Sequence, residues 1–361
     1  MARSFFSLSL ASLFSNNSSS SNTADAFSLQ QQQQAVQQQR VCVTTENDEW
    51  TEVARRIATD LNIPYFAWKE DVGDDFAGTH ILDVVPFGGT TTRDEYALGI
   101  RPITPSSKNS KRRQQRPALS LARTSGSPSP HIVDFCPPHD SRIAKRIQSG
   151  GSDMLIKAVS PRKIPGGAIV YDLTAGFGQD SLLILENGAS QVCMVERDPI
   201  VATLLQDALR RRDNIIIQNN NNNNNDDEQH YYYSNSKAKL SLSVGHGATI
   251  IKSSHHDAAA IVQQQQQPDV CYLDPMFPPR TKSAAVKKNM QILHSLLESQ
   301  ELQAEQEQLD DQVELLEAAL TVAKARVVVK RPIHAPHLGN IKPSFDLRGS
   351  VNRFDVYVTS S

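Results

Sequence analysis

Short apolar runs alternate with amphipathic stretches from about residue 131 to the end of the chain. The runs are rich in β-branched and aromatic residues, as expected for the buried strands of a parallel sheet. They comprise 169–171, 191–195, 248–251, 270–273 and 326–332. Helical spacing of apolar positions predicts helices between them, over 199–212 and 300–325. This order of strands and helices predicts an α/β fold on a mostly parallel sheet.

The pattern changes at both ends of this region. Residues 345–348 and 353–358 flank the pair Gly349-Ser350, which predicts an antiparallel hairpin that closes the sheet. Upstream, a strand at 41–43 and a helix over 50–61 predict a small N-terminal α/β domain.

Polar low-complexity tracts divide the chain. Residues 1–40 contain a short apolar run, a serine and asparagine tract and glutamine repeats, so we interpret them as a targeting or disordered leader. The small domain is then expected over 41–103, a basic linker over 104–130 and the larger domain over 131–361. Within the larger domain we expect low-complexity insertions near 218–247 and 263–267.

Charge and cysteine content narrow the function classes. The formal net charge is −2, so the whole chain has no strong nonspecific attraction to nucleic acid, and RNA contact requires local basic patches. The four cysteines include no Cys-x-x-Cys pair, which favours neither a disulfide framework nor a metal site. No apolar run reaches the length of a membrane span, so no membrane partner is expected.

A strand, a glycine turn and a helix follow one another at 169–185. This arrangement presents bare backbone and N–H groups to a nucleotide-like ligand, and Glu196, at the end of the next strand, suits the hydroxyls of a ribose. A dinucleotide site would have a third glycine where this chain has Ser181, and a pyrophosphate would be repelled by the nearby aspartates. The sulfonium and ammonium groups of S-adenosylmethionine (SAM) would be attracted, so the pattern favours the methyl donor as cofactor. The turn residues concerned are Asp172, Ala175, Gly176, Gly178 and Asp180.

A second motif follows the strand at 270–273 and reads Asp-Pro-Met-Phe-Pro-Pro. It resembles the Asp/Asn-Pro-Pro-Tyr/Phe loop of amino-group methyltransferases, with Met276 at the second proline. The Asp274 carboxylate and the Pro275 carbonyl can accept hydrogen bonds from an exocyclic amine and orient it toward a methyl group. Phe277 offers a flat face on which a base can stack.

Several other residues are weaker candidates. Ser254 and His255 follow the predicted strand at 248–251, where the adenine ring often lies in such sheets. Basic residues near the two motifs could contact RNA phosphates, although each group could equally form a solvated surface. They are Arg142, Arg146, Lys282, Lys287 and Lys288.

Five ordered motifs together resemble the RsmJ family of methyltransferases of small-subunit ribosomal RNA. They begin at Asp172, Val195, Tyr272, Lys282 and Val327. The resemblance covers roughly residues 41–358 and implies a class I SAM-dependent methyltransferase fold, with the N2 amine of a guanine in 16S-type rRNA as substrate. It also implies that SAM contacts fall on Gln179, Asp180, Glu196, Arg197 and Asp274, and that Lys330 and Arg331 contact RNA. Gln179 stands where bacterial members usually have arginine, and the family's serine pair after the fourth strand falls on 253–255.

The expected partner is therefore small-subunit rRNA or the small ribosomal subunit, with no metal. Two alternatives stay open: methylation of an adenine N6 in DNA or RNA, and a cofactor-binding rRNA assembly factor without turnover. The leader together with a bacterial-type substrate indicates a plastid or mitochondrion, and otherwise the cytoplasm.

Overall fold

The computed structural model describes residues 41–45, 50–62, 96–103, 116–123, 131–138, 141–221, 238–256, 266–275 and 305–359. The chain forms two compact units. One contains residues 1–133 and 281–302, and the other contains residues 134–280 and 303–361.

The N-terminal unit holds a four-stranded sheet in the order β1-β2-β3-β4. Its elements are β1 (Val41–Thr45), α3 (Thr51–Leu61), β2 (Tyr96–Ile103), β3 (Arg116–Arg123) and β4 (His131–Ile132). The predicted strand at 41–43 and helix at 50–61 are confirmed. The linker prediction is wrong for residues 116–123, which form β3 and pair antiparallel with β2. Buried Leu119 and Leu121 alternate within this strand, a pattern that the surrounding Ser, Pro and basic residues obscure in the sequence.

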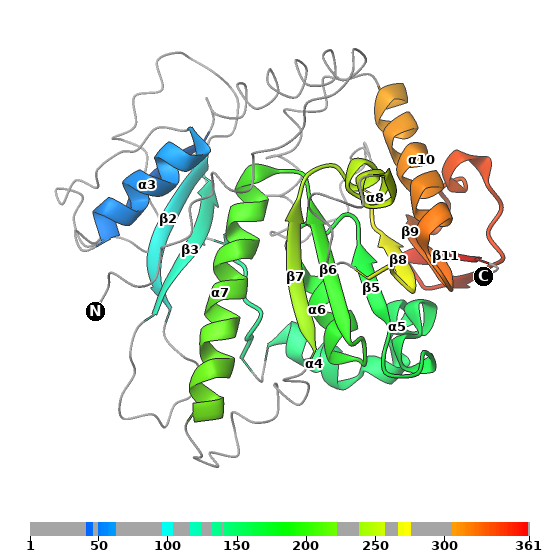
Figure 1. The fold of residues 1–361 in the computed structure, drawn as a ribbon, viewed down its shortest axis with the longest axis horizontal. Helices are drawn as coiled ribbons and strands as arrows, with labels where there is room; N and C mark the ends of the chain where they lie inside the picture. Colours follow the sequence, from blue (N-terminus) through cyan, green and yellow to red (C-terminus); the bar gives the residue numbers. More distant parts are fainter. Residues whose placement is uncertain are drawn as a thin grey trace. The chain divides into compact units, whose positions relative to one another are not determined.

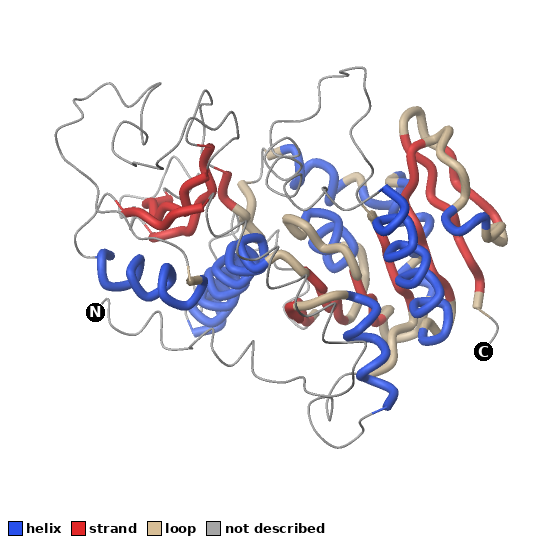
Figure 2. Tube along the Cα trace, turned by 90° about the horizontal axis from the view of Figure 1, so that it is seen from above, coloured by secondary structure: helices blue, strands red, loops and turns tan. Residues whose placement is uncertain are grey.

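The second unit is built on a seven-stranded sheet in the order β10-β11-β9-β8-β5-β6-β7 (Figure 1). The strands are β5 (Ile169–Asp172), β6 (Gln191–Glu196), β7 (Lys239–Val244), β8 (Val270–Leu273), β9 (Arg326–Pro332), β10 (Phe345–Arg348) and β11 (Asn352–Val358). Strands β5 to β9 are parallel, whereas β11 pairs antiparallel with both β9 and β10. The predicted sheet and its closing hairpin are confirmed, and Figure 2 shows the hairpin at one edge near the C terminus.

Helices cover both faces of this sheet. They are α4 (Arg142–Gln148), α5 (Met154–Val159), α6 (Gln179–Glu186), α7 (Pro199–Asn221), α8 (Gly247–His256) and α10 (Glu305–Val322). In Figure 1, α8 and α10 lie in front of the sheet, and α4 and α6 lie behind it. The front core joins α8 and α10 to alternate strand residues, among them Tyr171, Cys193, Cys271 and Val329. Because the strands are buried on both faces, their sequences are continuously apolar.

Two predictions in this unit need correction. The run Ala248-Thr249-Ile250-Ile251 is part of helix α8, and the strand lies earlier, at β7. Its β-branched residues indicated a strand, but they follow the break at Gly245 and Gly247, and Ala248 and Ile251 pack as successive turns of a helix against the core. Consequently, part of the insertion predicted near 218–247 is regular structure, since α7 extends to Asn221 and β7 begins at Lys239.

Within the described ranges, no helix combines the length and the apolar character that a bilayer span requires.

Candidate active site at the carboxyl edge of the sheet

The predicted chemistry converges at the carboxyl ends of β5, β6 and β8. Strand β5 leads through α6 to β6 on one side, whereas its neighbour on the other side is β8. The direction of the strand order therefore reverses between β5 and β8, which is where open α/β sheets bind ligands. Asp172 and Glu196 end their strands, and Asp274 follows the last residue of β8.

A buried carboxylate at the end of β5 stabilises the glycine turn that follows this strand. Asp172 is 1% exposed, accepts a 2.5 Å hydrogen bond from the Ser181 hydroxyl and another from the Thr174 N–H at 3.3 Å. Burial raises the pKa of Asp172 to about 7, although the Ser181 hydrogen bond opposes this shift. Ser181 thus ties α6 to the end of β5, and Asp172 supports the turn from within the core.

The two turn glycines adopt backbone conformations that favour glycine. The φ angles of Gly176 and Gly178 are 53° and 68°, in the left-handed region. A Cβ on Gly178 would lie 2.8 Å from the Phe135 ring, so no side chain fits there without displacement. Gly178 is therefore needed both for the left-handed bend between β5 and α6 and for the close packing of this turn against Phe135.

Glu196 faces the same turn from the end of β6. Its carboxylate accepts the Gly176 N–H at 2.9 Å and the Asp198 N–H at 2.8 Å. Burial, reinforced by nearby Asp198, raises the pKa of Glu196 to about 7. Each carboxylate oxygen can accept two hydrogen bonds, so both oxygens retain capacity for the two hydroxyls of a ribose. The geometry therefore fits the ribose of an adenosyl group.

Asp180, in the first turn of α6, links four elements. One carboxylate oxygen accepts a 2.7 Å bond from Arg146, which also binds Asp153 at 2.7 Å. The other oxygen accepts the Tyr272 hydroxyl at 2.8 Å and the Lys330 ammonium at 3.1 Å. Burial tends to raise the pKa of Asp180, but the charges of Lys330 and Arg146 outweigh it and hold the pKa well below its usual range. Asp180 is therefore an anion at neutral pH.

Asp274 lies beside this group. Its Oδ2 accepts a 2.6 Å bond from Lys330, and its backbone N–H donates to the Thr174 hydroxyl at 2.6 Å. Burial raises the pKa of Asp274, and the charge of Lys330 acts in the opposite direction. The side chain keeps 34% exposure, against 16% for Asp180. Asp274 is thus the more accessible of the two carboxylates that Lys330 contacts.

Arg146, Asp153, Asp180, Asp274 and Lys330 form one ionic group, and its net charge indicates which ligand the site favours. Two cations, Arg146 and Lys330, contact three carboxylates, so the group carries one net negative charge. A net negative site attracts a sulfonium or ammonium group and repels a pyrophosphate. Together with the ribose-accepting geometry of Glu196, the residues fit SAM, which supplies an electrophilic methyl group when bound.

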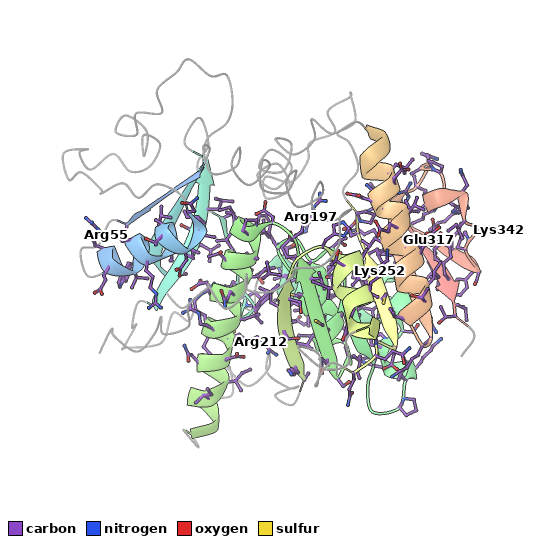
Figure 3. All side chains as sticks on the ribbon, turned by 45° about the horizontal axis from the view of Figure 1, so that its top comes forward. Arg55, Arg197, Arg212, Lys252, Glu317 and Lys342 are labelled. Atoms are coloured by element: carbon purple, nitrogen blue, oxygen red, sulfur yellow. The ribbon has the colours of Figure 1, made fainter. Side chains whose placement is uncertain are left out.

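The other predicted site residues differ in accessibility. Gln179, Arg142 and Arg197 are exposed; Arg197, which Figure 3 labels, directly follows the last residue of β6. Ala175 is buried, and its N–H donates to the Val195 carbonyl at 3.0 Å, so it fixes the turn to the next strand. Pro275 is buried and directly follows Asp274.

Some predictions lie outside the described residues, namely Met276, Phe277, Lys282, Lys287 and Lys288.

The prediction that Ser254 and His255 directly follow a strand is wrong. Both belong to the second half of α8, several residues beyond the end of β7. The residues that directly follow β7 are Gly245, His246 and Gly247, because this strand ends at Val244.

Three predicted RNA contacts also change. Arg331 is 3% exposed, and its guanidinium donates to the Pro336 carbonyl at 2.9 Å, so it does not present a surface to RNA. Burial, aided by Arg353, lowers the pKa of Arg331 to about 10. Lys330 and Arg146 instead belong to the ionic group around Asp180. Lys330 and Arg331 differ in environment because adjacent residues of a strand such as β9 face opposite sides of the sheet.

Sequence reasoning missed three residues of the site: Tyr272, Thr174 and Asp153. Tyr272 precedes Asp274 by two positions, and strand periodicity places such residues on one side. Thr174 belongs to the glycine turn, but its contact with Asp274 spans 100 residues. Asp153 caps α5 by accepting the Leu155 N–H, a role visible in sequence, whereas its pairing with Arg146 is not.

In the part of the chain that the structure describes, no group of three or more His, Cys, Asp or Glu side chains is arranged to hold a metal ion.

Comparison with known proteins agrees with this geometry. Residues 103–359 match the protein family described as "Putative SAM-dependent methyltransferase". The ribosomal RNA small subunit methyltransferase J of Thioalkalivibrio sulfidiphilus is 37% identical over 244 residues, covering 67% of this chain and 81% of that protein. The protein of the same name from Neisseria meningitidis serogroup C is 34% identical and covers 73% of this chain and 90% of its own length.

Among solved structures, a SAM-dependent methyltransferase from Neisseria gonorrhoeae matches with a TM-score of 0.51 and 26% identity, covering 88% of this chain and 95% of that one. The predicted class I fold is therefore confirmed. The chain therefore belongs to the ribosomal RNA small subunit methyltransferase J family of SAM-dependent methyltransferases.

Proposed function

We propose that this protein transfers the methyl group of SAM to the N2 amine of a guanine in small-subunit rRNA. The observation that carries the proposal is the position of Asp274, at the switch point of the sheet and next to a site that fits the methyl donor. The names of the bacterial relatives support small-subunit rRNA as the substrate class.

The residues present can orient an amine. One oxygen of Asp274 is held by Lys330, which leaves Oδ1 to accept an N–H of the exocyclic amine. The amine lone pair is delocalised into the ring, so alignment with the methyl group supplies most of the rate enhancement. Bound SAM would supply an electrophilic methyl group whose sulfur keeps the electron pair of the S–C bond, and Asp274 would hold the amine nitrogen in line with that methyl group.

Proton loss completes the reaction. The nitrogen carries an acidic proton after attack, so no strong base is needed to remove it. Asp274 Oδ1, already hydrogen-bonded to the amine, receives this proton and passes it to water. Buried Tyr272 does not serve as a base, because burial and the neighbouring carboxylates raise its pKa well above the usual range.

The direct test combines purified protein, labelled SAM and small ribosomal subunits or rRNA from a bacterial strain that lacks the modification. We expect N2-methylguanosine in the nucleoside digest. Recovery of N6-methyladenosine would support the adenine alternative, and SAM binding without transfer to any RNA would support an assembly factor. Either result would refute the proposal.

The compartment stays a prediction. The leader proposed for residues 1–40 lies outside the described residues, and relatives from bacteria give no support to an organellar address. Imaging of a tagged protein with and without this segment tests the proposal.

A further inference from the structure

Asp274 and Lys330 together present an ordered row of hydrogen-bonding groups. A lysine ammonium has three N–H donors, and in Lys330 two of them are used by Asp274 at 2.6 Å and Asp180 at 3.1 Å. One donor therefore remains. The structure records no hydrogen bond to Asp274 Oδ1 from any described residue, and Oδ2 keeps one of its two acceptor positions. The row reads acceptor, acceptor, donor.

We propose that this pair selects guanine by reading its Watson–Crick edge, with Lys330 as the specificity-determining residue. The edge of guanine presents the N2–H and N1–H donors followed by the O6 acceptor, which is the complement of this row. Asp274 would accept from N2–H and N1–H, and Lys330 would donate to O6. The inference rests on the proposed function and adds the residue that identifies the base.

The same row disfavours the other amine-bearing bases. Adenine offers one amine donor and then the N1 acceptor, which would face a carboxylate oxygen. Cytosine offers an amine donor followed by two acceptors, so its N3 would also face that carboxylate. In both cases a carboxylate oxygen of Asp274 faces an acceptor of the base and gains no partner, and sites built on hydrogen bonds reject such ligands strongly.

Discrimination requires a rigid row, and the contacts around it provide rigidity. Lys330 is held between two carboxylates, and Asp180 is itself fixed by Arg146 and Tyr272. The backbone of Asp274 is fixed by its N–H bond to Thr174. The side chain of Lys330 is 22% exposed, so its ammonium is partly shielded from water yet reachable from the site. The Asp–Lys pair therefore cannot rotate freely to suit a different base.

The test measures nucleotide binding and does not depend on methyl transfer. Protein loaded with S-adenosylhomocysteine is titrated by NMR with guanosine and adenosine 5′-monophosphates. We expect wild type to favour the guanine nucleotide by about tenfold or more, the size expected for a charged hydrogen bond. Lys330→Met should weaken guanine binding about tenfold more than it weakens adenine binding, because only guanine accepts a hydrogen bond from the ammonium. Lys324→Met is the matched control, because Lys324 also pairs with an aspartate, Asp269, but at the opposite edge of the sheet.

A second measurement uses only wild-type protein, so it holds if Lys330→Met does not fold. Inosine monophosphate keeps N1–H and O6 but lacks the amine, whereas the 2-aminopurine nucleotide keeps the amine and lacks both other groups. The proposal predicts tighter binding of the inosine nucleotide. Equal binding, tighter binding of 2-aminopurine, or a guanine preference that survives Lys330→Met would overturn it.

The outcomes separate the two proposals. A Lys330-dependent guanine preference without N2-methylguanosine formation would refute the proposed function and leave the recognition of guanine standing. Formation of N2-methylguanosine by a protein with no Lys330-dependent preference would do the reverse.

Discussion

One aspartate–lysine pair lies at the amino ends of β8 and β9 (the amino edge of the sheet), and another lies at their carboxyl ends (the carboxyl edge). The two pairs differ in distance, in exposure and in their further contacts. At the amino edge, Lys324 lies 3.8 Å from Asp269 and its side chain is 43% exposed. At the carboxyl edge, Lys330 lies 2.6 Å from Asp274 and is 22% exposed. The same two residue types thus form a loose surface pair at one edge and a tight, shielded pair at the other.

The remaining contacts explain what this difference means. Asp269 uses its second oxygen to accept the Ile169 N–H at 2.9 Å, and its backbone carbonyl accepts the Ala325 N–H at 2.9 Å. It therefore joins β5, β8 and β9 as a structural residue. Asp274 instead leaves Oδ1 to a ligand and lies beside the glycine turn. Position relative to the strand ends, more than residue type, assigns the functional role.

Substitution of each aspartate should separate these roles most clearly. Asp274→Ala removes the acceptor that orients the amine, and we expect kcat to fall about 10²- to 10³-fold. Asp269→Ala should leave kcat unchanged and lower the free energy of unfolding by about 1–3 kcal/mol, because the partly buried Ile169 N–H loses its acceptor. Single-turnover methyl transfer and urea denaturation measure the two effects. Similar kcat losses in both variants would contradict the assignment of a catalytic role to Asp274 and a structural role to Asp269.

Alanine substitution of one glycine at each end of β5 compares the carboxyl edge with the amino edge of the sheet. Gly178→Ala combines a left-handed φ of 68° with an overlap on Phe135, and should cost about 3 kcal/mol of stability. Gly166→Ala, before β5, has a φ of 78° and open space around it, so it should cost about 1 kcal/mol.

Affinity for S-adenosylhomocysteine, measured by calorimetry on the folded fraction, should fall only for Gly178→Ala. Equal affinities in the two variants would show that the turn after β5 does not hold the cofactor.

The pH dependence of cofactor binding tests Glu196. Its raised pKa of about 7 means that the carboxyl is largely protonated at pH 6 and ionised at pH 8. Ribose hydroxyls donate to the ionised form, so the affinity for S-adenosylhomocysteine should increase as the pH rises through 7. A pKa decrease of half to one unit on binding corresponds to about a threefold to tenfold gain. Glu196→Gln should flatten the profile, and a profile unchanged by this substitution would exclude Glu196 as the titrating group.

The smallest effect is expected at the amino edge. Lys324→Met should change the free energy of unfolding by less than about 0.5 kcal/mol, because exposed ion pairs at such distances contribute little. Chemical denaturation with and without added salt checks this value. A loss above 2 kcal/mol would mean that the Lys324–Asp269 pair stabilises the fold far more than its distance and exposure predict.

The sequence predicts those parts of the molecule in which local pattern and tertiary structure agree. The apolar runs that become β5, β6, β8 and β9 are buried on both faces, so composition alone identifies them. Asp172, Glu196 and Asp274 could be placed because each ends or directly follows such a run. Where a short β-branched segment packs as a helix, as at 248–251, local preference gives the wrong element.

Contacts between distant residues are beyond such reasoning. Lys330 lies 150 positions from Asp180, and the side-chain direction along β9 decides that it enters the site while Arg331 is buried elsewhere. The run Lys-Arg after an apolar strand indicated a basic surface. Its actual role follows from the register of β9 with β8, which the sequence does not contain.

A crystal structure of the protein with S-adenosylhomocysteine tests the central claim most directly. The account predicts the ribose hydroxyls on Glu196, the backbone of Gly176 against the ligand and the sulfur facing the carboxylate of Asp274. A ligand bound elsewhere, or an Asp274 side chain turned away from the sulfur, would contradict it.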